Sequence, residues 1–434
     1  MMDEPMDERT GERTDERMDE ARAREHIDRL AAELCATGPA LRGLGPERRA
    51  RAVAAVAARL MDPDTAPGRD ARGRISRSAG LSPAMVDWAL RTTLETATIE
   101  ALIAMATRAL TSGPGQPVPP RLVSVILAGN VFTAAWRPMI LPLLVGAPVL
   151  CKGSSRDDGF PRLVAATLRQ LDPEVGRALD VVSFPGGEVA LEQSLFARSD
   201  VAMVYGSDAT IAAVRARLPA TVRLLEHGHG VSAAYVGQDA LASPERATAA
   251  ARAIALDAAA YDQRGCLSPH VVWIRRGGTV DGRNMARLIH EALNALDDEL
   301  PRGPVPPEVG AAQMQWRGVA AVLGQLFEGA GHAVAYLDAT PDQVRLGPGW
   351  RNLLVLECDG PVAAAERLAA HGAHLAAVGV ACDGDERDVL AGSLPPPACP
   401  VICPVGRMQT PALDRFSAGT GEIDGLLRWM TMES

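Results

Sequence analysis

The sequence predicts an α/β protein of two domains, the first of which contains a doubly wound parallel sheet. Short apolar runs alternate with segments of helical periodicity through the middle of the chain, and this alternation is typical of parallel β-α-β units. The runs are mostly apolar, as in strands that helices cover on both faces. Five such strands are expected in the first domain, at residues 123–127, 147–153, 180–184, 200–206 and 221–228.

The remaining elements complete this pattern. Helices are expected between the strands, at residues 136–144, 161–171, 191–197 and 210–218. A second α/β unit is expected after Gly230, with strands at residues 232–237 and 271–274 and a long helix opened by Ser243-Pro244. Two such units imply an active site in the cleft between them.

The composition sets the size of the core and excludes some partners. Of the 434 residues, 47% are hydrophobic and only 4% aromatic, which suits two or three domains of helices rich in small residues packed on sheets. The formal net charge is −9, and the sequence has no Lys/Arg-rich block or basic aromatic face. Nucleic-acid binding is therefore not expected.

The N-terminal 25 residues repeat short charged units and contain almost nothing to bury, so a disordered charged tail is expected there. They include no apolar stretch of the kind found in signal peptides. The most apolar long segment, residues 131–151, contains Arg137 and three prolines, which suits a buried segment better than a membrane span. A cytoplasmic protein without a membrane span is expected.

Seven cysteines are scattered without a CxxC pair or a Cys/His cluster of zinc spacing, so no metal site is expected. Such cysteines are typical of reduced thiols in a cytoplasmic protein. One of them, Cys266, lies in YDQRGCLSP (261–269), after a long predicted helix and before a strand. Gly265 would let the backbone come close to a substrate there. The pattern allows either a nucleophile or a buried apolar thiol.

Glu226 is a second candidate, in LLEHGHGVSAAYV (224–236). A carboxylate at the end of a strand, beside glycines, suits either a general base or a surface charge. His227 and His229 are two apart in a strand and so point the same way. No carboxylate or thiol partner accompanies them, so they do not indicate a metal site.

Polar residues also follow the first two predicted strands. Asn130, in LAGNVF, has a side-chain amide that can donate to an oxyanion or cap the next helix. Lys152 precedes Ser154, Ser155 and Arg156, which is either a phosphate-binding set or an ordinary turn. The dinucleotide fingerprint GxGxxG is absent after the first strand.

Taken in order, these motifs resemble those of the aldehyde dehydrogenase superfamily, from about residue 100 to the C-terminus. Within it, the sequence is similar to the acyl-CoA reductases of bacterial bioluminescence, which make fatty aldehyde. The separations agree with the superfamily: 22 residues from Asn130 to Lys152 and 40 from Glu226 to Cys266. The segments that carry the resemblance are LAGNVF, GAPVLCKGSSRD, VYGSDATI, LLEHGHG, YDQRGCLSP and CPVGRMQTP (403–411).

The resemblance implies a role for each matched residue. Cys266 takes the position of the nucleophile, and Asn130 together with the Cys266 backbone amide takes that of the oxyanion hole. Glu226 takes the position of the general acid/base. The superfamily binds a dinucleotide without GxGxxG, and the matched cofactor-binding positions are Lys152, Ser154, Ser155, Arg156, Gly206 and Ser207.

The segment after Lys152 favours NADPH over NADH. Relatives that prefer NAD tend to carry Glu three positions after this lysine, where it pairs with the ribose hydroxyls and repels a 2′-phosphate. This chain has Ser155 and then Arg156, a neutral donor and a cation, which suit the phosphate instead.

The resemblance implies reduction of an acyl thioester to the aldehyde through an acyl-enzyme on Cys266, with acyl-CoA, an acyl carrier or an acyl-protein as donor. A free cysteine has little thiolate near neutral pH, so the site must lower the pKa of this thiol. The sequence does not place the histidines or Arg264 near enough for that role. Two alternatives stay open: oxidation of an aldehyde by NAD(P) with the same residues, and a non-redox acyl-transfer protein.

The expected organisation has four parts: a disordered tail (1–25), an NAD(P)-binding domain with N-terminal helices (26–229), a catalytic domain (230–403) and a C-terminal segment that returns to the cofactor domain (404–434). Only SGPGQPVPP (112–120) stands where many relatives carry the strand-paired arm that assembles their tetramers. A homo-oligomer and a complex with an acyl-activating partner are therefore both open.

Overall fold

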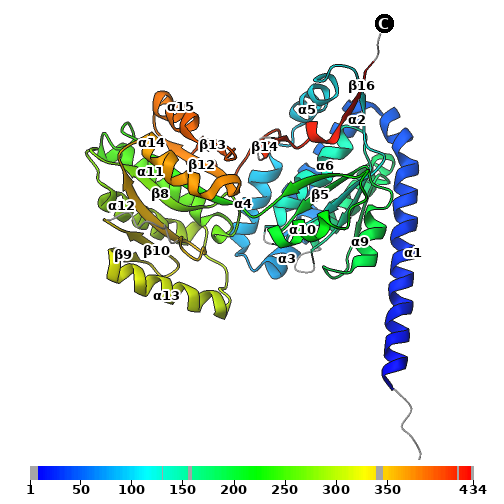
Figure 1. Ribbon diagram of the computed structural model, residues 1–434, viewed down its shortest axis with the longest axis horizontal. Coiled ribbons are helices and arrows are strands. Elements are labelled where there is room, and N and C mark those ends of the chain that lie inside the picture. The colour runs from blue at the N-terminus through cyan, green and yellow to red at the C-terminus, as the bar shows by residue number, and fades with distance from the viewer. Residues whose placement is uncertain (1–7, 130, 155–158, 339–345, 418–419, 432–434) are drawn as a thin grey trace, which may run out of the picture.

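The computed structural model describes residues 8–129, 131–154, 159–338, 346–417 and 420–431. These residues form two lobes, each built on its own sheet, with the five-stranded sheet on the right of Figure 1 and the seven-stranded sheet on the left. The chain passes from the first sheet to the second between His227 and Val231, and it leaves the second sheet after Pro404.

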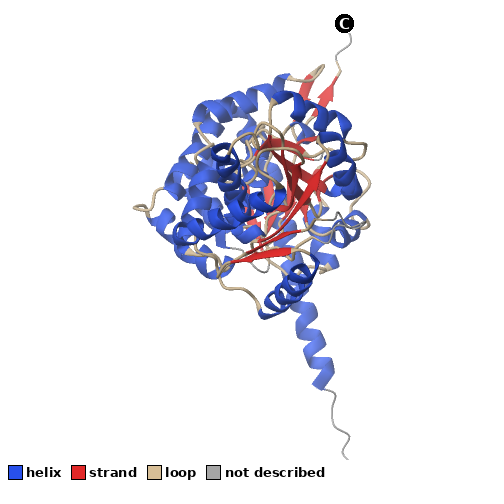
Figure 2. Ribbon diagram, turned by 90° about the vertical axis from the view of Figure 1, so that its left-hand side faces the viewer, coloured by secondary structure: helices blue, strands red, loops and turns tan. Residues whose placement is uncertain are grey.

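Five helices precede the first sheet: α1 (Glu8–Gly43), α2 (Gly45–Met61), α3 (Ala66–Ala79), α4 (Pro83–Leu94) and α5 (Ile99–Thr111). The structure differs here from the expected disordered tail, because α1 already begins at Glu8, whereas residues 1–7 lie outside the described part of the chain. Glu and Arg, which are abundant in this segment, are good helix formers. In both views the first turns of α1 extend beyond the rest of the protein (Figures 1 and 2).

The first sheet has the strand order β4-β3-β2-β5-β6, and all its neighbours are parallel. The order reverses between β2 and β5, which confirms the expected doubly wound topology. Its strands are β2 (Val123–Ile126), β3 (Val149–Lys152), β4 (Leu179–Val182), β5 (Val201–Tyr205) and β6 (Arg223–His227). The connections contain η1 (Phe132–Ala135), α6 (Trp136–Leu144), α7 (Gly159–Leu171), α8 (Pro173–Gly176), α9 (Val189–Phe196) and α10 (Asp208–Arg215).

The second sheet has the order β13-β12-β7-β8-β11-β10-β9 and is parallel except for the edge strand β9. Its strands are β7 (Val231–Val236), β8 (Pro269–Arg275), β9 (Gln325–Glu328), β10 (Ala333–Tyr336), β11 (Asn352–Cys358), β12 (Leu375–Ala381) and β13 (Val401–Pro404). The connections contain α11 (Pro244–Ala259), η2 (Ala260–Gln263), α12 (Gly282–Glu299), α13 (Pro307–Leu323), α14 (Pro361–Leu368), η3 (Ala369–His374) and α15 (Gly384–Ser393). Ser243 caps α11 by accepting a hydrogen bond from the Arg246 amide, as the sequence predicts.

After β13 the chain forms a short ribbon of β14 (Phe416–Ser417) and β15 (Thr420–Gly421), then η4 (Asp424–Leu426) and β16 (Arg428–Met430). Strand β16 pairs antiparallel with β1 (Gln116–Val118), which precedes the first sheet. The stretch that stands in place of the expected assembly arm is therefore half of a two-stranded ribbon, and the C-terminus supplies the other half.

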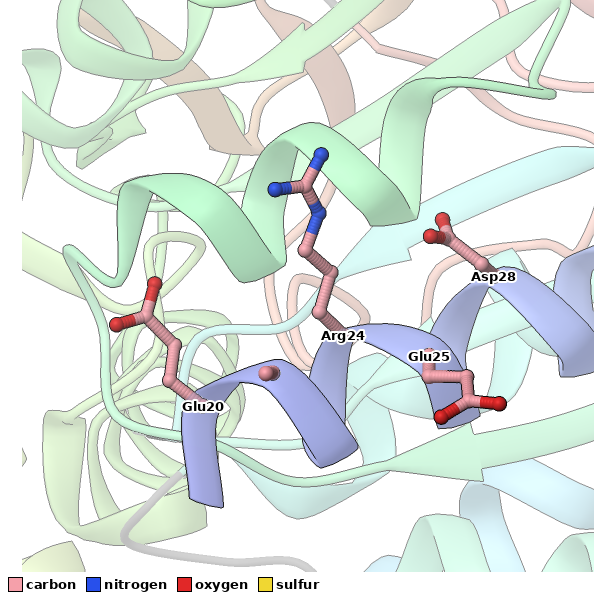
Figure 3. Close-up of a pocket in the computed structure, with 5 residues that line it drawn as sticks. Glu20, Arg24, Glu25 and Asp28 are labelled. Atoms are coloured by element: carbon pink, nitrogen blue, oxygen red, sulfur yellow. The ribbon is translucent and has the colours of Figure 1, made fainter. Parts of the chain in front are cut away.

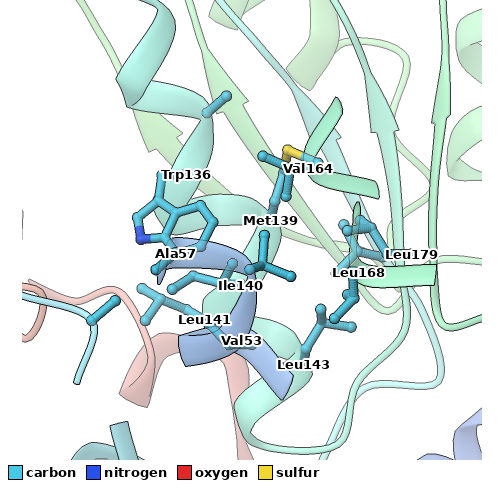
Figure 4. Packing of buried hydrophobic residues seen from close by; sticks show 14 of the residues in the cluster. Val53, Ala57, Trp136, Met139, Ile140, Leu141, Leu143, Val164, Leu168 and Leu179 are labelled. Atoms are coloured by element: carbon cyan, nitrogen blue, oxygen red, sulfur yellow. The ribbon is translucent and has the colours of Figure 1, made fainter. Parts of the chain in front are cut away.

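The core of the first lobe explains the apolar segment at residues 131–151. All nine residues of α6 are buried. Its side chains pack against helices α2 and α7 and against β4, as Figure 4 shows for Trp136, Met139, Ile140, Leu141 and Leu143. In the part of the chain that the structure describes, no helix is long and apolar enough to cross a membrane.

Candidate active site

The predicted cofactor residues lie along one edge of the first sheet. Lys152 ends β3 in register with Ile126 at the end of β2, and Ile126 is in register with Val204, which pairs in turn with Glu226. These are carboxyl ends of parallel strands beside the point where the strand order reverses, which is where open α/β sheets bind ligands. Of the predicted residues, Asn130, Ser155 and Arg156 lie outside the described residues.

Lys152 is buried, and only 5% of it is exposed. Burial lowers the pKa of its ammonium group, while the nearby carboxylate of Glu192 opposes that change. The ammonium nitrogen also lies 4.9 Å from the centre of the Phe184 ring. Ser154 follows in a half-buried position. The lysine is thus a cation held at the sheet edge by its surroundings.

Gly206 and Ser207 form the turn between β5 and α10. The Gly206 amide donates to the carbonyl of His227 at 3.2 Å, which joins this turn to the end of β6. A Cβ at position 206 would lie 2.9 Å from a methyl carbon of Thr210, so the turn is packed closely. Ser207 caps α10 by accepting from the Thr210 amide at 3.3 Å. The Ser207 side chain therefore has a structural role whatever else it does.

Glu226 and His227 lie on opposite faces of β6. Glu226 is exposed and forms an ion pair with Arg215 of α10. His227 stacks on Tyr205, with ring centres 4.2 Å apart, and burial lowers the pKa of its imidazole. His229 is exposed, and no group of three or more potential metal ligands occurs among the residues described.

Cys266 lies between η2 and β8, at the amino edge of the second sheet. The residue as a whole is exposed, yet the protein atoms around its thiol desolvate that group and raise its pKa, an effect that the positive charge of Arg415 opposes. Its carbonyl accepts from Ser232 Oγ at 2.7 Å. A Cβ on Gly230 would lie 3.1 Å from the Cys266 Cβ, so the cysteine rests on the segment that links β6 to β7. Cys266 thus lies beside the segment that leads from the carboxyl end of β6 into the second sheet.

The backbone before Cys266 has an unusual conformation. Tyr261, Asp262 and Gln263 have φ values of 52°, 52° and 58°, in the left-handed region that non-glycine residues rarely adopt. Each such residue costs about 1–2 kcal/mol, so the surrounding contacts must hold the loop in this shape.

The side chains of this loop supply those contacts. The hydroxyl of Tyr261 lies 2.8 Å from that of Thr133 in η1. Asp262 accepts two hydrogen bonds from Arg351, at 2.8 and 3.1 Å, and both side chains are fully buried. Gln263 Oε1 accepts from the Asn352 amide at 2.8 Å.

Arg264 completes the set of anchors. Its Nη1 donates to the carbonyl of Ala79 at 2.8 Å, its Nε donates to the carbonyl of Tyr261, and its guanidinium lies over the ring of Trp350. Four consecutive side chains therefore attach the cysteine loop to different parts of the protein.

The CPVGRMQTP segment (403–411) packs directly on this loop. Buried Asp257 of α11 accepts hydrogen bonds from the amides of Gly406 and Met408. Burial raises the pKa of Asp257 to about 7, although these amide donors oppose the rise. A Cβ on Gly265 would lie 3.2 Å from Gln409 Oε1. The segments YDQRGCLSP and CPVGRMQTP, which are far apart in the sequence, are thus neighbours in the structure.

Three charged residues at this site carry no role in the sequence interpretation. Arg137 and Glu422 are buried and form an ion pair, and the charges of Glu422 and of half-buried Arg415 both act on the Cys266 thiol. A signal for Arg137 exists in the sequence, because a cation inside an apolar segment requires a buried partner. Nothing in the sequence indicates which carboxylate is that partner.

The pocket drawn in Figure 3 lies elsewhere, along α1. Its walls come from two turns of this one helix, and they are mostly exposed. None of them is a predicted site residue, and a groove on one helix face does not assemble groups for chemistry. The lining residues are Glu20, Ala21, Arg24, Glu25 and Asp28.

The two-lobed fold is that of the aldehyde dehydrogenases. The chain is similar to methylmalonate-semialdehyde dehydrogenase from Oceanimonas doudoroffii, with 15% identity, a TM-score of 0.73 and 93% of this chain covering 89% of that one. It is also similar to NADP-dependent glyceraldehyde-3-phosphate dehydrogenase from Bacillus halodurans, solved with NADP. Here the identity is 15% and the TM-score 0.71, and 93% of this chain covers 90% of that one. A third such structure is aldehyde dehydrogenase 21 from Physcomitrella patens with succinate. Its identity to this chain is 14% and the TM-score 0.70, and 93% of this chain covers 89% of that one.

The family is narrower than the fold. The family profile Acyl-CoA reductase (LuxC) matches residues 107–427, about three quarters of the chain. The chain therefore belongs to the LuxC family of acyl-CoA reductases. A search of curated protein sequences finds no match.

Proposed function

We propose that this acyl-CoA reductase converts a long-chain fatty acyl thioester into the aldehyde with NADPH, through an acyl-enzyme on Cys266. The observation that carries the proposal is the position of this thiol. Cys266 is an exposed residue on a loop that four side chains anchor. It lies against the segment that leads from the carboxyl end of β6 into the second sheet.

The first step is acyl transfer to sulfur. The Cys266 thiolate attacks the thioester carbonyl, and the tetrahedral intermediate expels the carrier thiol to leave a new thioester on the enzyme. The Cys266 amide and the side chain of Asn130, as the resemblance implies, stabilise the negative charge on oxygen. A loop in a fixed conformation suits this step, because the attacking atom must be held in line with the carbonyl.

The carboxyl ends of the strands in the first sheet offer groups that fit a dinucleotide. Lys152 offers a buried cation beside the reversal of strand order, and Gly206 and Ser207 provide a closely packed turn at the start of α10. Bound NADPH would supply the hydride that reduces the acyl carbon. Ser154 and Ser155 are proposed to donate hydrogen bonds, and Arg156 to pair with the 2′-phosphate that distinguishes NADPH from NADH.

Glu226 is proposed to carry the proton when the reduced intermediate collapses to aldehyde. In the structure its carboxylate faces Arg215 at the surface. Exposed pairs of this kind contribute about 0–1 kcal/mol, so the carboxylate can leave Arg215 at little cost. The proposal therefore requires Glu226 to turn during the cycle.

Residues 26–229 and 404–434 are proposed to form the cofactor domain, and residues 230–403 the catalytic domain. The β1–β16 ribbon supports this division, because the C-terminus pairs with a strand beside the first sheet. The donor is proposed to be acyl-CoA or an acyl-protein in the cytoplasm. The assembly is proposed to be either a homo-oligomer or a complex with an acyl-activating partner.

The test is Cys266→Ala in the full chain, with labelled long-chain acyl-CoA and NADPH. We expect no protein-bound label and no acyl-CoA-dependent NADPH oxidation. Cys399→Ala is the matched control, because Cys399 is also exposed, and it should keep both activities. Full activity in the Cys266 variant would overturn the proposal. Rates with NADH, and with aldehyde plus NADP, test the cofactor and the direction.

A further inference from the structure

The ribbon of β14 and β15 brings together two opposite charges that both act on the thiol of Cys266. Phe416 pairs with Gly421 and Ser417 with Thr420, in antiparallel register. Continuing this register places Arg415 opposite Glu422, just beyond the last pair. Figure 1 shows β14 between the two lobes. The fold therefore presents an arginine and a glutamate from a ribbon that belongs to neither sheet.

Arg137 of α6 holds this ribbon in place. Its Nε donates to Glu422 Oε2 at 3.0 Å, and both side chains are nearly buried, with 11% and 3% exposed. Its Nη1 and Nη2 donate to the carbonyls of Ala412 and Arg415. All three guanidinium nitrogens are thus used at the ribbon. Because the ion pair is buried, Glu422 is the natural counter-ion of Arg137.

The group formed by Arg137, Arg415 and Glu422 has one more positive charge than negative charges. Arg137 and Arg415 are two cations, and Glu422, the carboxylate that acts most strongly on Arg415, is already bonded to Arg137. The Nε of Arg415 is buried and has no hydrogen-bond partner among the described residues. A guanidinium that is partly withdrawn from water and has no carboxylate of its own is stabilised by an anion placed near it. The site is therefore built to receive a negative charge.

The neighbouring groups do not supply that negative charge. Tyr205 is neutral at ordinary pH, because burial raises the pKa of its phenol well above the usual value. His227 is neutral too, because burial lowers the pKa of its imidazole. The group that can become an anion there is the thiol of Cys266, which Arg415 attracts and Glu422 repels.

Other cations of the region are engaged elsewhere. Arg264, in the same loop as Cys266, is bonded to the carbonyls of Ala79 and Tyr261 and lies over Trp350. Lys152 lies at the end of β3, between Glu192 and Phe184. Arg415 is thus the cation best placed to act on the sulfur.

We propose that Arg415 is the counter-ion of the Cys266 thiolate, and that Arg137 and Glu422 hold the ribbon that positions it. On formation of the thiolate, the proton leaves sulfur for solvent and the cluster becomes neutral. On acyl transfer the thiolate charge moves to the substrate oxygen, still beside the same guanidinium. Arg415 is a positioning and charge-setting residue in this proposal, and the proposal rests on the role of Cys266 proposed above.

The test is the pH dependence of iodoacetamide alkylation at Cys266 in the full-length protein, followed on the Cys266 peptide by mass spectrometry. Opposite charges within a few ångströms shift a pKa by about 1–3 units. We expect Arg415→Gln to raise the apparent pKa of Cys266 by about one unit or more, which slows alkylation about tenfold at neutral pH. We expect Glu422→Gln, which keeps an acceptor for Arg137, to lower the apparent pKa of Cys266.

Three controls make the result decisive. Arg415→Lys should keep a profile close to that of the unaltered protein, because the charge remains. Arg407→Gln, which removes an exposed cation from the same segment, should leave the profile unchanged, as should alkylation of exposed Cys399 in every variant. A general loosening of the fold would shift the apparent pKa of Cys266 in the same direction in Arg415→Gln and in Glu422→Gln.

An unchanged profile in Arg415→Gln, or a shift of the same sign in Arg415→Gln and Glu422→Gln, would show the proposal to be wrong. Alkylation needs neither acyl substrate nor NADPH. Loss of this proposal therefore leaves the result for Cys266→Ala untouched, and failure of the reductase assignment leaves the alkylation profile interpretable.

Discussion

The loop of Cys266 and the end of strand β6 carry the two residues that the proposed reaction brings together, but they are held in different ways. Four consecutive side chains before Cys266 are bonded to partners in other elements, and the Asp262–Arg351 pair among them is completely buried. Glu226 has a single ion pair, with Arg215, and both side chains are about half exposed.

This difference matches the two tasks. A nucleophile must meet the carbonyl at one distance and angle, so its loop benefits from contacts that permit one conformation. A proton carrier must reach different atoms in successive steps, so a weak surface pair suits it better than a buried one. Rigidity and freedom are thus divided between two segments that meet near Gly230.

The first prediction concerns the contacts that hold the loop of Cys266 in one conformation. Arg351→Ala leaves the carboxylate of Asp262 buried without its cation, and loss of one partner of a buried pair costs about 3–5 kcal/mol. We expect the free energy of unfolding in urea to fall by that amount and acyl-enzyme formation to fall with it. Arg276→Ala, at an exposed pair with Asp359, is the control and should cost less than about 1 kcal/mol. Equal effects of the two changes would refute the rigid-loop interpretation.

The second prediction changes the mobile half. Glu226→Gln removes the titrating group, and loss of a general acid or base slows catalysis about 10²–10⁴-fold. The free energy of unfolding should stay within about 1 kcal/mol, because the pair with Arg215 is exposed. Labelled acyl-enzyme should still form, since the proposed role falls in aldehyde release. The measurements are steady-state NADPH oxidation, trapping of the acyl-enzyme and urea unfolding. A normal rate of turnover would remove Glu226 from the mechanism.

Much of the fold could be predicted from the sequence. Continuous apolar runs such as VSVIL indicated parallel strands covered on both faces, and β2, β3 and β5 are such strands. The Ser243-Pro244 pair predicted the start of α11 because a serine cap and a proline at the first position act locally. The family assignment rested on several short motifs in order, and the match over residues 107–427 confirms it.

What escaped prediction depends on contacts between distant segments. Arg137 and Glu422 are 285 residues apart, and only folding shows that they are partners. Strand β1, three residues within a Gly/Pro stretch, exists because β16 pairs with it. The left-handed conformation of Tyr261, Asp262 and Gln263 contradicts their local preferences and follows from their anchors. Such features arise from tertiary structure and leave no periodic signal in the sequence.

The last prediction concerns the contact that ties the Cys266 loop to the first lobe. Tyr261→Phe removes the hydroxyl that lies 2.8 Å from Thr133 and keeps the ring in its buried place. One buried hydrogen bond contributes about 0.5–1.5 kcal/mol, so we expect a loss of about 1 kcal/mol in urea unfolding and less than about a tenfold loss of turnover. Thr133→Val should cost a similar amount, and the double variant little more than either alone, because both changes remove the same bond. Strict additivity of the two changes would mean that the loop is held without this contact, and that Asp262, Gln263 and Arg264 are sufficient to fix the position of the thiol.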